Sequence, residues 1–186
     1  MMIAVCVKQI ADAGAPYELD PDTRFVVRPD DQVLDDTDRY GVEVALQLAE
    51  EIGEDATVTL VSMSPSGTLQ GIRQALAMGA DEAVHLKDDA FVGSDALGTA
   101  TILQRAIAGR PYDLILTGAI SGDEARGHVG PMLAAMLDIP MVALATELSV
   151  EGGTATVRHE VEGGLERITR MVLPALVTVQ TGLNEP

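Results

Sequence analysis

A glycine-rich stretch carries the residue types best suited to holding a ligand. It reads TGAISGDEARGHVGP, from Thr117 to Pro131, and its four interior glycines flank an expected helix start. Glycines let a backbone approach a ligand closely, and the amides at a helix start attract a phosphate. Arg126 would add positive charge there and His128 a hydrogen bond. The stretch favours a phosphate-binding loop; the alternative interpretation is a plain strand–helix connection in which Asp123 is a helix cap.

The remaining polar residues form no catalytic or metal-binding pattern. The loop has neither the Gly-Lys-Ser/Thr of a Walker motif nor the G-x-G-x-x-G of a dinucleotide fingerprint. His85, His128 and His159 are scattered without metal-ligand spacing, and one cysteine cannot build a cysteine-based metal cluster. We therefore expect no metal site, no catalytic residues and no enzymatic activity of the chain's own.

The cysteine, Cys6, lies inside an expected strand near the N-terminus. The simplest interpretation is a small buried hydrophobic side chain. The functional alternative is a small wall against an adenine ring. A nucleophilic role is disfavoured because the sequence pairs no base with this thiol.

Composition limits the class of protein. The chain has 186 residues, a net charge of −17, 47% hydrophobic residues and 3% aromatic residues, which predicts one domain, 1–186, with an aliphatic core. Such acidity disfavours nucleic acid as a partner, because phosphate binding needs a basic surface. The apolar runs are too short for a membrane span, and the N-terminus does not resemble a secretion signal, so we expect a cytoplasmic location.

Strand and helix patterns alternate along most of the chain. Expected strands cover 2–10, 56–64, 82–88, 112–118 and 173–179; expected helices cover 37–53, 66–79, 94–109 and 123–138; a small excursion, read as a hairpin, covers 24–36; and 140–180 reads as antiparallel strands. Gly53 and Gly79 mark helix ends, and Ser94 or Asp95 caps the third helix.

This alternation predicts an α/β fold, a doubly wound, mostly parallel sheet of the Rossmann-like three-layer αβα type, with added antiparallel strands near the C-terminus. Ligands of such sheets bind beyond the carboxyl ends of the strands, near the point where the strand order reverses. That rule selects four places in this chain: after Val7, after Val61, around 34–38, and after Leu116.

Several segments together resemble one family, the beta subunit of electron-transfer flavoprotein. They are VCVKQIAD, VEVALQL, IRQALAMGADEAVHL, YDLILTG with GPMLAAMLDIP, and VEGGLERITRMVLPALVTVQTGLNEP. The matches run in order over essentially the whole chain. The resemblance implies a heterodimer with an alpha subunit that carries most of the site for a redox FAD. It also implies the adenine-nucleotide-binding type of this fold, in which the beta subunit holds AMP in ordinary members and a second FAD in electron-bifurcating ones. Electrons would come from acyl-CoA or related dehydrogenases and pass to a respiratory acceptor.

The resemblance also assigns site residues. The expected cofactor-binding residues are Cys6, Asp35, Asp36, Thr37, Asp38, Met63, Gly118, Ala119, Ile120, Ser121, Gly122, Asp123, Glu124, Ala125, Arg126, Gly127, His128 and Val129. Glu166 matches a position that contacts the flavin domain of the alpha subunit. Lys8 and Glu43 match recurrent positions for which we expect a structural role.

Departures from the family pattern affect the ligand. Asp35-Asp36 stands where the family usually has Asn-Pro, Ser64 where it prefers Gly, and the loop 119–129 differs from the usual sequence. The extra negative charge should weaken binding of an anionic ligand unless these side chains point to solvent. These differences favour AMP or an empty site over a second FAD.

The family pattern continues beyond Asn-Glu-Pro into an arm that grips the dehydrogenase. A chain that ends at Pro186 is therefore expected to dock dehydrogenases differently. A stand-alone adenine-nucleotide sensor on the same fold is the alternative function. A nucleotide-activating enzyme is a third possibility, disfavoured because VKQIADAGAP lacks the loop motif such enzymes need.

Overall fold

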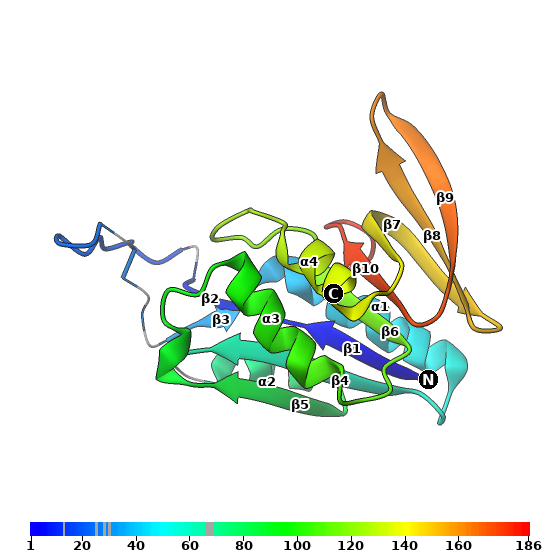
Figure 1. Cartoon of the computed structure of the whole chain (residues 1–186), viewed down its shortest axis with the longest axis horizontal. Coiled ribbons are helices and arrows are strands. Elements are labelled where there is room, and N and C mark those ends of the chain that lie inside the picture. The colour runs from blue at the N-terminus through cyan, green and yellow to red at the C-terminus, as the bar shows by residue number, and fades with distance from the viewer. Residues whose placement is uncertain (13, 25, 28, 30, 66–68) are drawn as a thin grey trace.

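Strands and helices alternate in the computed structural model, which describes residues 1–12, 14–24, 26–27, 29, 31–65 and 69–186 (Figure 1). The strands are β1 (Met2–Cys6), β2 (Gln9–Ile10), β3 (Val33–Leu34), β4 (Thr57–Ser64), β5 (Glu82–Lys87), β6 (Leu114–Gly118), β7 (Met141–Glu151), β8 (Thr154–Val161), β9 (Leu165–Val172) and β10 (Ala175–Val179). The helices are α1 (Asp36–Ile52), α2 (Gln70–Ala77), α3 (Ala96–Ile107), α4 (Val129–Leu137) and a short 3₁₀ helix, η1 (Asp89–Phe91). None of the described helices is both long and apolar enough to cross a membrane.

Eight strands form one sheet in the order β5-β4-β1-β6-β10-β7-β8-β9. The strands from β5 to β7 run parallel, and β8 and β9 extend the sheet antiparallel at one edge. The predicted fold class, a doubly wound parallel sheet with added antiparallel strands, is therefore confirmed. One detail differs: β10 inserts between β6 and β7 and is parallel to both, so part of the segment 140–180 belongs to the parallel sheet.

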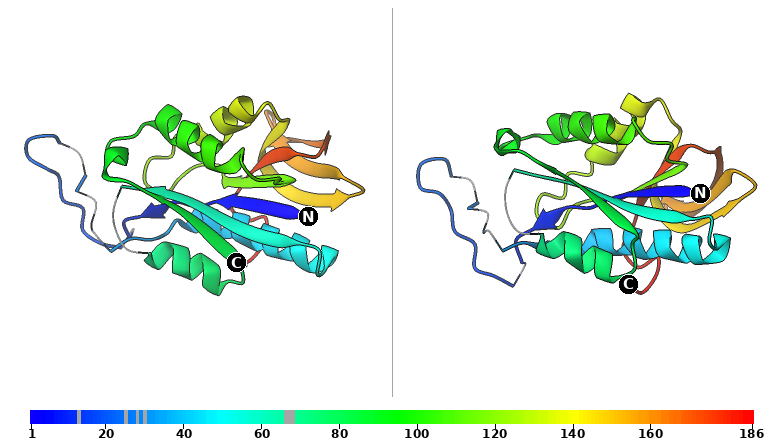
Figure 2. Two further views of the ribbon diagram at one scale, coloured as in Figure 1. Left: turned by 60° about the horizontal axis from the view of Figure 1, so that its bottom comes forward. Right: turned by 90° about the horizontal axis from the view of Figure 1, so that it is seen from below.

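Helices cover both faces of the sheet. α1 and α2 lie on one face and α3 and α4 on the other, as Figure 2 shows for the cyan and blue-green pair against the green and yellow-green pair. Each face has its own aliphatic core, one that includes Val42 and Leu48 of α1 and one that includes Leu103 of α3 and Leu133 of α4. Burial of aliphatic side chains on both faces explains why the central strands are almost uniformly apolar.

Glycine ends two helices as predicted. Gly53 ends α1 with a φ of 88°, and Gly79 ends the turn after α2 with a φ of 129°. Both angles lie in the region that favours glycine. Asp95 caps α3, which ends at Ile107 with Ala108 as its C-terminal cap. The predicted start of the second helix near Ser66 lies outside the described residues.

The fourth helix is shorter than predicted. It begins at Val129 and not near Asp123, because Ala125 and Gly127 have φ of 51° and 63° and interrupt a right-handed helix. The interpretation of Asp123 as the cap of this helix is therefore wrong: the cap position belongs to His128. Residues 119–128 form an extended loop between β6 and α4.

The first predicted strand is divided in two. β1 ends at Cys6, and β2 leaves the main sheet to pair antiparallel with β3, with Gln9 opposite Leu34. The prediction that residues 24–36 form a hairpin is therefore wrong for β3, because β3 pairs with β2 and not with a strand of that segment. Residues 25, 28 and 30 of the segment lie outside the described residues. The β2–β3 pair places Lys8 beside Asp35, whose amide donates to the Lys8 carbonyl at 3.0 Å.

Candidate functional site

The candidate site lies at the point where the strand order reverses, between β1 and β6. Three segments meet there: the end of β1 with Lys8, the first turn of α1, and the loop after β6. All three follow the carboxyl ends of parallel strands or begin a helix next to them (Figure 1). This is the position where doubly wound sheets bind ligands.

Asp35 joins the start of α1 to the loop. Its side chain is only 1% exposed. One carboxylate oxygen accepts from the Thr37 amide at 3.0 Å and thereby caps the helix, and the other accepts from the Gly122 amide at 2.8 Å. The Thr37 hydroxyl adds a second link, since it donates to the Ile120 carbonyl at 2.8 Å. The extra acid that departs from the family pattern is therefore directed inward, onto the loop backbone.

Asp38 makes a similar link one turn later. Its carboxylate accepts from the Lys8 amide at 2.6 Å and from the Gly118 amide at 3.2 Å. The pKa of Asp38 is raised to about 7, mainly by burial and in part by the charge of Asp35, against the opposing effect of the two amide hydrogen bonds and the Lys8 charge. Gly118 permits this approach, because a Cβ at that position would collide with the Asp38 carboxylate.

Lys8 holds the loop from the strand side. Its Nζ lies 2.6 Å from Oδ1 of Asp123, 3.5 Å from Oγ of Ser121 and 3.9 Å from Oε2 of Glu124. Lys8, for which a structural role is expected, lies at the centre of the candidate site. The signal in the sequence was a lysine directly after a buried strand that ends at the predicted binding edge.

Cys6 and Met63 lie on the face of the sheet that α3 and α4 cover. Cys6 is buried opposite Val61 and Thr117 of the neighbouring strands, and Met63 packs against the same apolar cluster. Burial, with a smaller effect of the Asp38 charge, raises the pKa of the Cys6 thiol to about 12. A thiol that stays protonated is a poor nucleophile, so the arrangement suits a small apolar wall.

The remaining loop residues lead to the start of α4. The amide of Ala119 donates to the Val179 carbonyl and that of Ala125 to the Ser121 carbonyl, both at 2.9 Å. Arg126 is exposed and lies 4.0 Å from Glu124, and His128 is exposed at the cap position of the helix. Gly127 is needed for the loop, because a Cβ there would lie 2.9 Å from the Ala119 carbonyl oxygen.

Two predicted residues lie apart from this cluster. Asp36 points to solvent and pairs with Arg39 at 3.1 Å. Glu166 lies on β9, in the hairpin that projects from the sheet edge (Figure 1). The guanidinium of Arg158 lies between two carboxylates there, 2.8 Å from that of Glu166 and 2.9 Å from that of Glu147. Glu166 is therefore exposed on the projecting hairpin, away from the candidate site at the reversal point.

The three histidines are in separate parts of the fold. His85 bonds to Ser64 at 2.7 Å, His159 to Thr169 at 3.2 Å, and His128 begins α4. The Ser64–His85 pair was not predicted, because nothing in the sequence indicates that these positions on β4 and β5 face one another. Within the described residues, no group of three or more His, Cys, Asp or Glu side chains is arranged to hold a metal ion.

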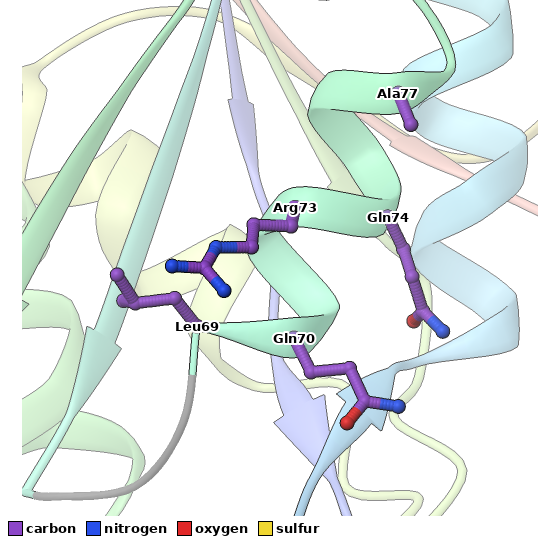
Figure 3. Close-up of a pocket in the computed structure, with 5 residues that line it drawn as sticks. All are labelled: Leu69, Gln70, Arg73, Gln74 and Ala77. Carbon is purple, nitrogen blue, oxygen red and sulfur yellow. The ribbon is translucent and has the colours of Figure 1, made fainter.

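Two grooves lie elsewhere on the surface. One of about 440 Å³ follows the outer side of α2, where Leu69, Gln70, Arg73, Gln74 and Ala77 line it (Figure 3). The other, of about 230 Å³, is lined by Ala11, Ala15, Pro16, Tyr17, Glu18, Val27 and Pro29. Neither includes a predicted site residue, and Gln74 already accepts a hydrogen bond from the Leu34 amide. Neither is therefore the candidate nucleotide site.

The residues at the reversal point include groups of the kinds that hold a nucleotide. Cys6 and Met63 offer an apolar wall, and the loop leads into a helix start that attracts one phosphate. The amides of Gly118 and Gly122, in contrast, already donate to carboxylates of the protein. These two inner amides of the loop therefore already have partners within the protein.

Comparison with known proteins agrees with this fold. A family model described as "Electron transfer flavoprotein domain" matches residues 23–186. The chain is 38% identical to the electron transfer flavoprotein subunit beta of Thermoanaerobacterium thermosaccharolyticum, over 100% of this chain and 70% of the relative. It is also 38% identical to that of Megasphaera elsdenii, over 100% of this chain and 71% of the relative, and 37% identical to that of Mycobacterium leprae, over 99% and 71%. Matches of this length and identity establish that the chain belongs to the electron transfer flavoprotein family and resembles its beta subunits.

Proposed function

We propose that this chain is the nucleotide-holding subunit of a cytoplasmic two-subunit electron carrier. It binds AMP at the reversal point between β1 and β6 and pairs with an alpha subunit that carries FAD. The complex accepts electrons from an acyl-CoA or related dehydrogenase and passes them to a respiratory acceptor. The observation that carries the proposal is the match to beta subunits along 99–100% of the chain.

FAD supplies the redox chemistry when bound. The residues of this chain hold and orient the nucleotide and dock the alpha subunit. Cys6 and Met63 form the wall for the adenine ring. The loop 118–129 faces the phosphate, and Asp35, Asp38 and Lys8 hold that loop in place through the contacts of 2.6–3.2 Å described above. Glu166, on the projecting hairpin, meets the alpha subunit.

A role as electron carrier agrees with the side chains at the site. Burial raises the pKa of the Cys6 thiol to about 12, and the Asp35 carboxylate accepts three hydrogen bonds, from the amide and hydroxyl of Thr37 and from the Gly122 amide. Such groups position a ligand and do not transform it. The chain is therefore assigned no reaction of its own.

Co-expression with the alpha-subunit gene of the same organism tests the proposal. We expect a complex with flavin absorbance, and mass spectrometry of the small molecules released from it should find AMP in about equimolar amount. Failure to form a complex, with no flavin in the purified protein, would contradict the proposal. Binding of AMP by the chain alone, without any complex, would instead favour the nucleotide sensor.

A further inference from the structure

The Asp35 carboxylate connects two segments that are 87 positions apart in the chain. It caps α1 through the Thr37 amide and accepts the Gly122 amide at 2.8 Å. A cap needs only one acceptor oxygen. The second oxygen therefore serves the loop and not the helix.

The Gly122 amide belongs to the class of group that binds phosphates. Backbone amides of glycine-rich loops at the binding edge of such a sheet donate to phosphate oxygens. In this chain a buried carboxylate takes that position, and charge-assisted bonds of this kind are stronger than neutral ones. Asp38 does the same at the Gly118 amide. Two inner amides of the loop thus donate to carboxyl groups of the protein itself.

The charges around the loop oppose a further anion. Lys8 is paired with Asp123 at 2.6 Å and lies 3.9 Å from Glu124, and Arg126 lies 4.0 Å from the same glutamate. Each cation therefore has a carboxylate beside it. An added phosphate group near Gly122 would face Asp35 across a short distance in a partly buried region, where repulsion between like charges is strong.

We infer that Asp35 determines the specificity of the nucleotide site: its carboxylate holds the Gly122 amide and so restricts the site to nucleotides with a single phosphate. This inference rests on the proposed nucleotide-binding function. Asp35 acts as a positioning residue as well, because the same hydrogen bond fixes the loop against the start of α1. Loss of that bond should free the amide for a second phosphate.

Asp35→Asn separates the two roles of the side chain. The asparagine oxygen can still accept from Thr37 and cap the helix, whereas its NH₂ group would oppose the Gly122 N–H, donor against donor. Asp95→Asn is the matched control, because Asp95 also caps a helix, accepting from Gly98 at 2.8 Å, but lies outside the site. Asp35→Ser, another good cap, replaces the first variant if it folds poorly.

Titration calorimetry with AMP, ADP and inorganic pyrophosphate tests the inference on the purified chain. We expect the affinity for ADP relative to AMP to rise about tenfold in Asp35→Asn, the value of one hydrogen bond to a charged group, and to stay unchanged in Asp95→Asn. Pyrophosphate should likewise bind more tightly to Asp35→Asn than to the wild type. Hydrogen exchange should show a faster Gly122 amide in Asp35→Asn alone.

The outcomes separate this inference from the proposed function. An unchanged ADP-to-AMP ratio, or a Gly122 amide that exchanges equally slowly in both proteins, would overturn the role of Asp35. A wild-type chain that binds no AMP and pairs with no alpha subunit would contradict the proposed function. Even then, pyrophosphate binding and amide exchange in the variant decide whether Asp35 holds the loop.

Discussion

The backbone amide of Lys8 donates a hydrogen bond of 2.6 Å to the buried carboxylate of Asp38. This bond ties the end of β1 to the first turn of α1, and the second oxygen of the same carboxylate accepts from Gly118 at the end of β6. One side chain thus holds together the three segments of the candidate site. Because Asp38 is only 6% exposed, its ionisation is costly, which has a consequence for stability.

Stability should fall with rising pH through Asp38. Its pKa is raised from 3.8 to about 7 in the folded protein, so the folded state binds the proton more tightly than the unfolded state. The contribution is fully present below pH 3.8, is lost as the pH rises to about 7, and is constant above, for a total of at most about 4 kcal/mol.

Urea unfolding from pH 4 to pH 8 measures this contribution. The decline attributable to Asp38 should be absent in Asp38→Asn, which cannot ionise. Asp36→Asn is the control, because the Asp36 side chain is 88% exposed and its profile should follow the wild type. Parallel profiles for wild type and Asp38→Asn would show that Asp38 ionises normally.

Gly118→Ala should destabilise the protein and loosen the site. A Cβ at Gly118 would collide with the Asp38 carboxylate and lie 3.0 Å from the Thr37 hydroxyl, so both side chains must move. Overpacking of this kind costs about 1–3 kcal/mol in the free energy of unfolding, measured by urea denaturation. Gly109→Ala is the control, because a Cβ there meets nothing within 4 Å. Equal effects of the two substitutions would refute the predicted collision.

The Cys6 thiol should resist modification in the folded protein. Burial raises its pKa from 9.0 to about 12, which lowers the thiolate fraction near pH 8 about a thousandfold. A thiol-specific disulfide reagent at pH 8 should therefore label the protein only slowly until urea unfolds it. Labelling of the folded chain at the rate of the unfolded one would contradict the placement of Cys6 in the apolar wall.

Glu166→Gln should weaken binding of the alpha subunit with little effect on stability. Glu166 is exposed on β9, and its pairing with Arg158 is a surface ion pair that contributes little to stability. Glu147→Gln is the control, because Glu147 lies on β7 and forms the other ion pair of Arg158. Affinity measured by surface plasmon resonance should fall for Glu166→Gln alone; equal losses for both variants would assign the effect to Arg158.

Local patterns in the sequence were sufficient for most of the elements and for the edge of the sheet at which the candidate site lies. Apolar runs predicted the core strands, Gly53 and Gly79 predicted helix ends, and the glycine-rich stretch after β6 predicted the loop. These features depend on neighbouring residues, because periodicity and left-handed backbone positions are properties of short segments. The ordered family motifs then predicted the family, which the comparisons confirm.

The tertiary structure alone decided how the acidic residues are used. In the sequence, Asp35 appears as extra charge near an anionic ligand and Lys8 as a structural residue. The fold brings Asp35 to Gly122 and Lys8 to Asp123, pairs that are 87 and 115 positions apart. Such contacts depend on the order of the strands and on which side chains are buried, and neither is a local property of the chain. Burial then converts these acids from solvent-facing charges into the groups that hold the loop.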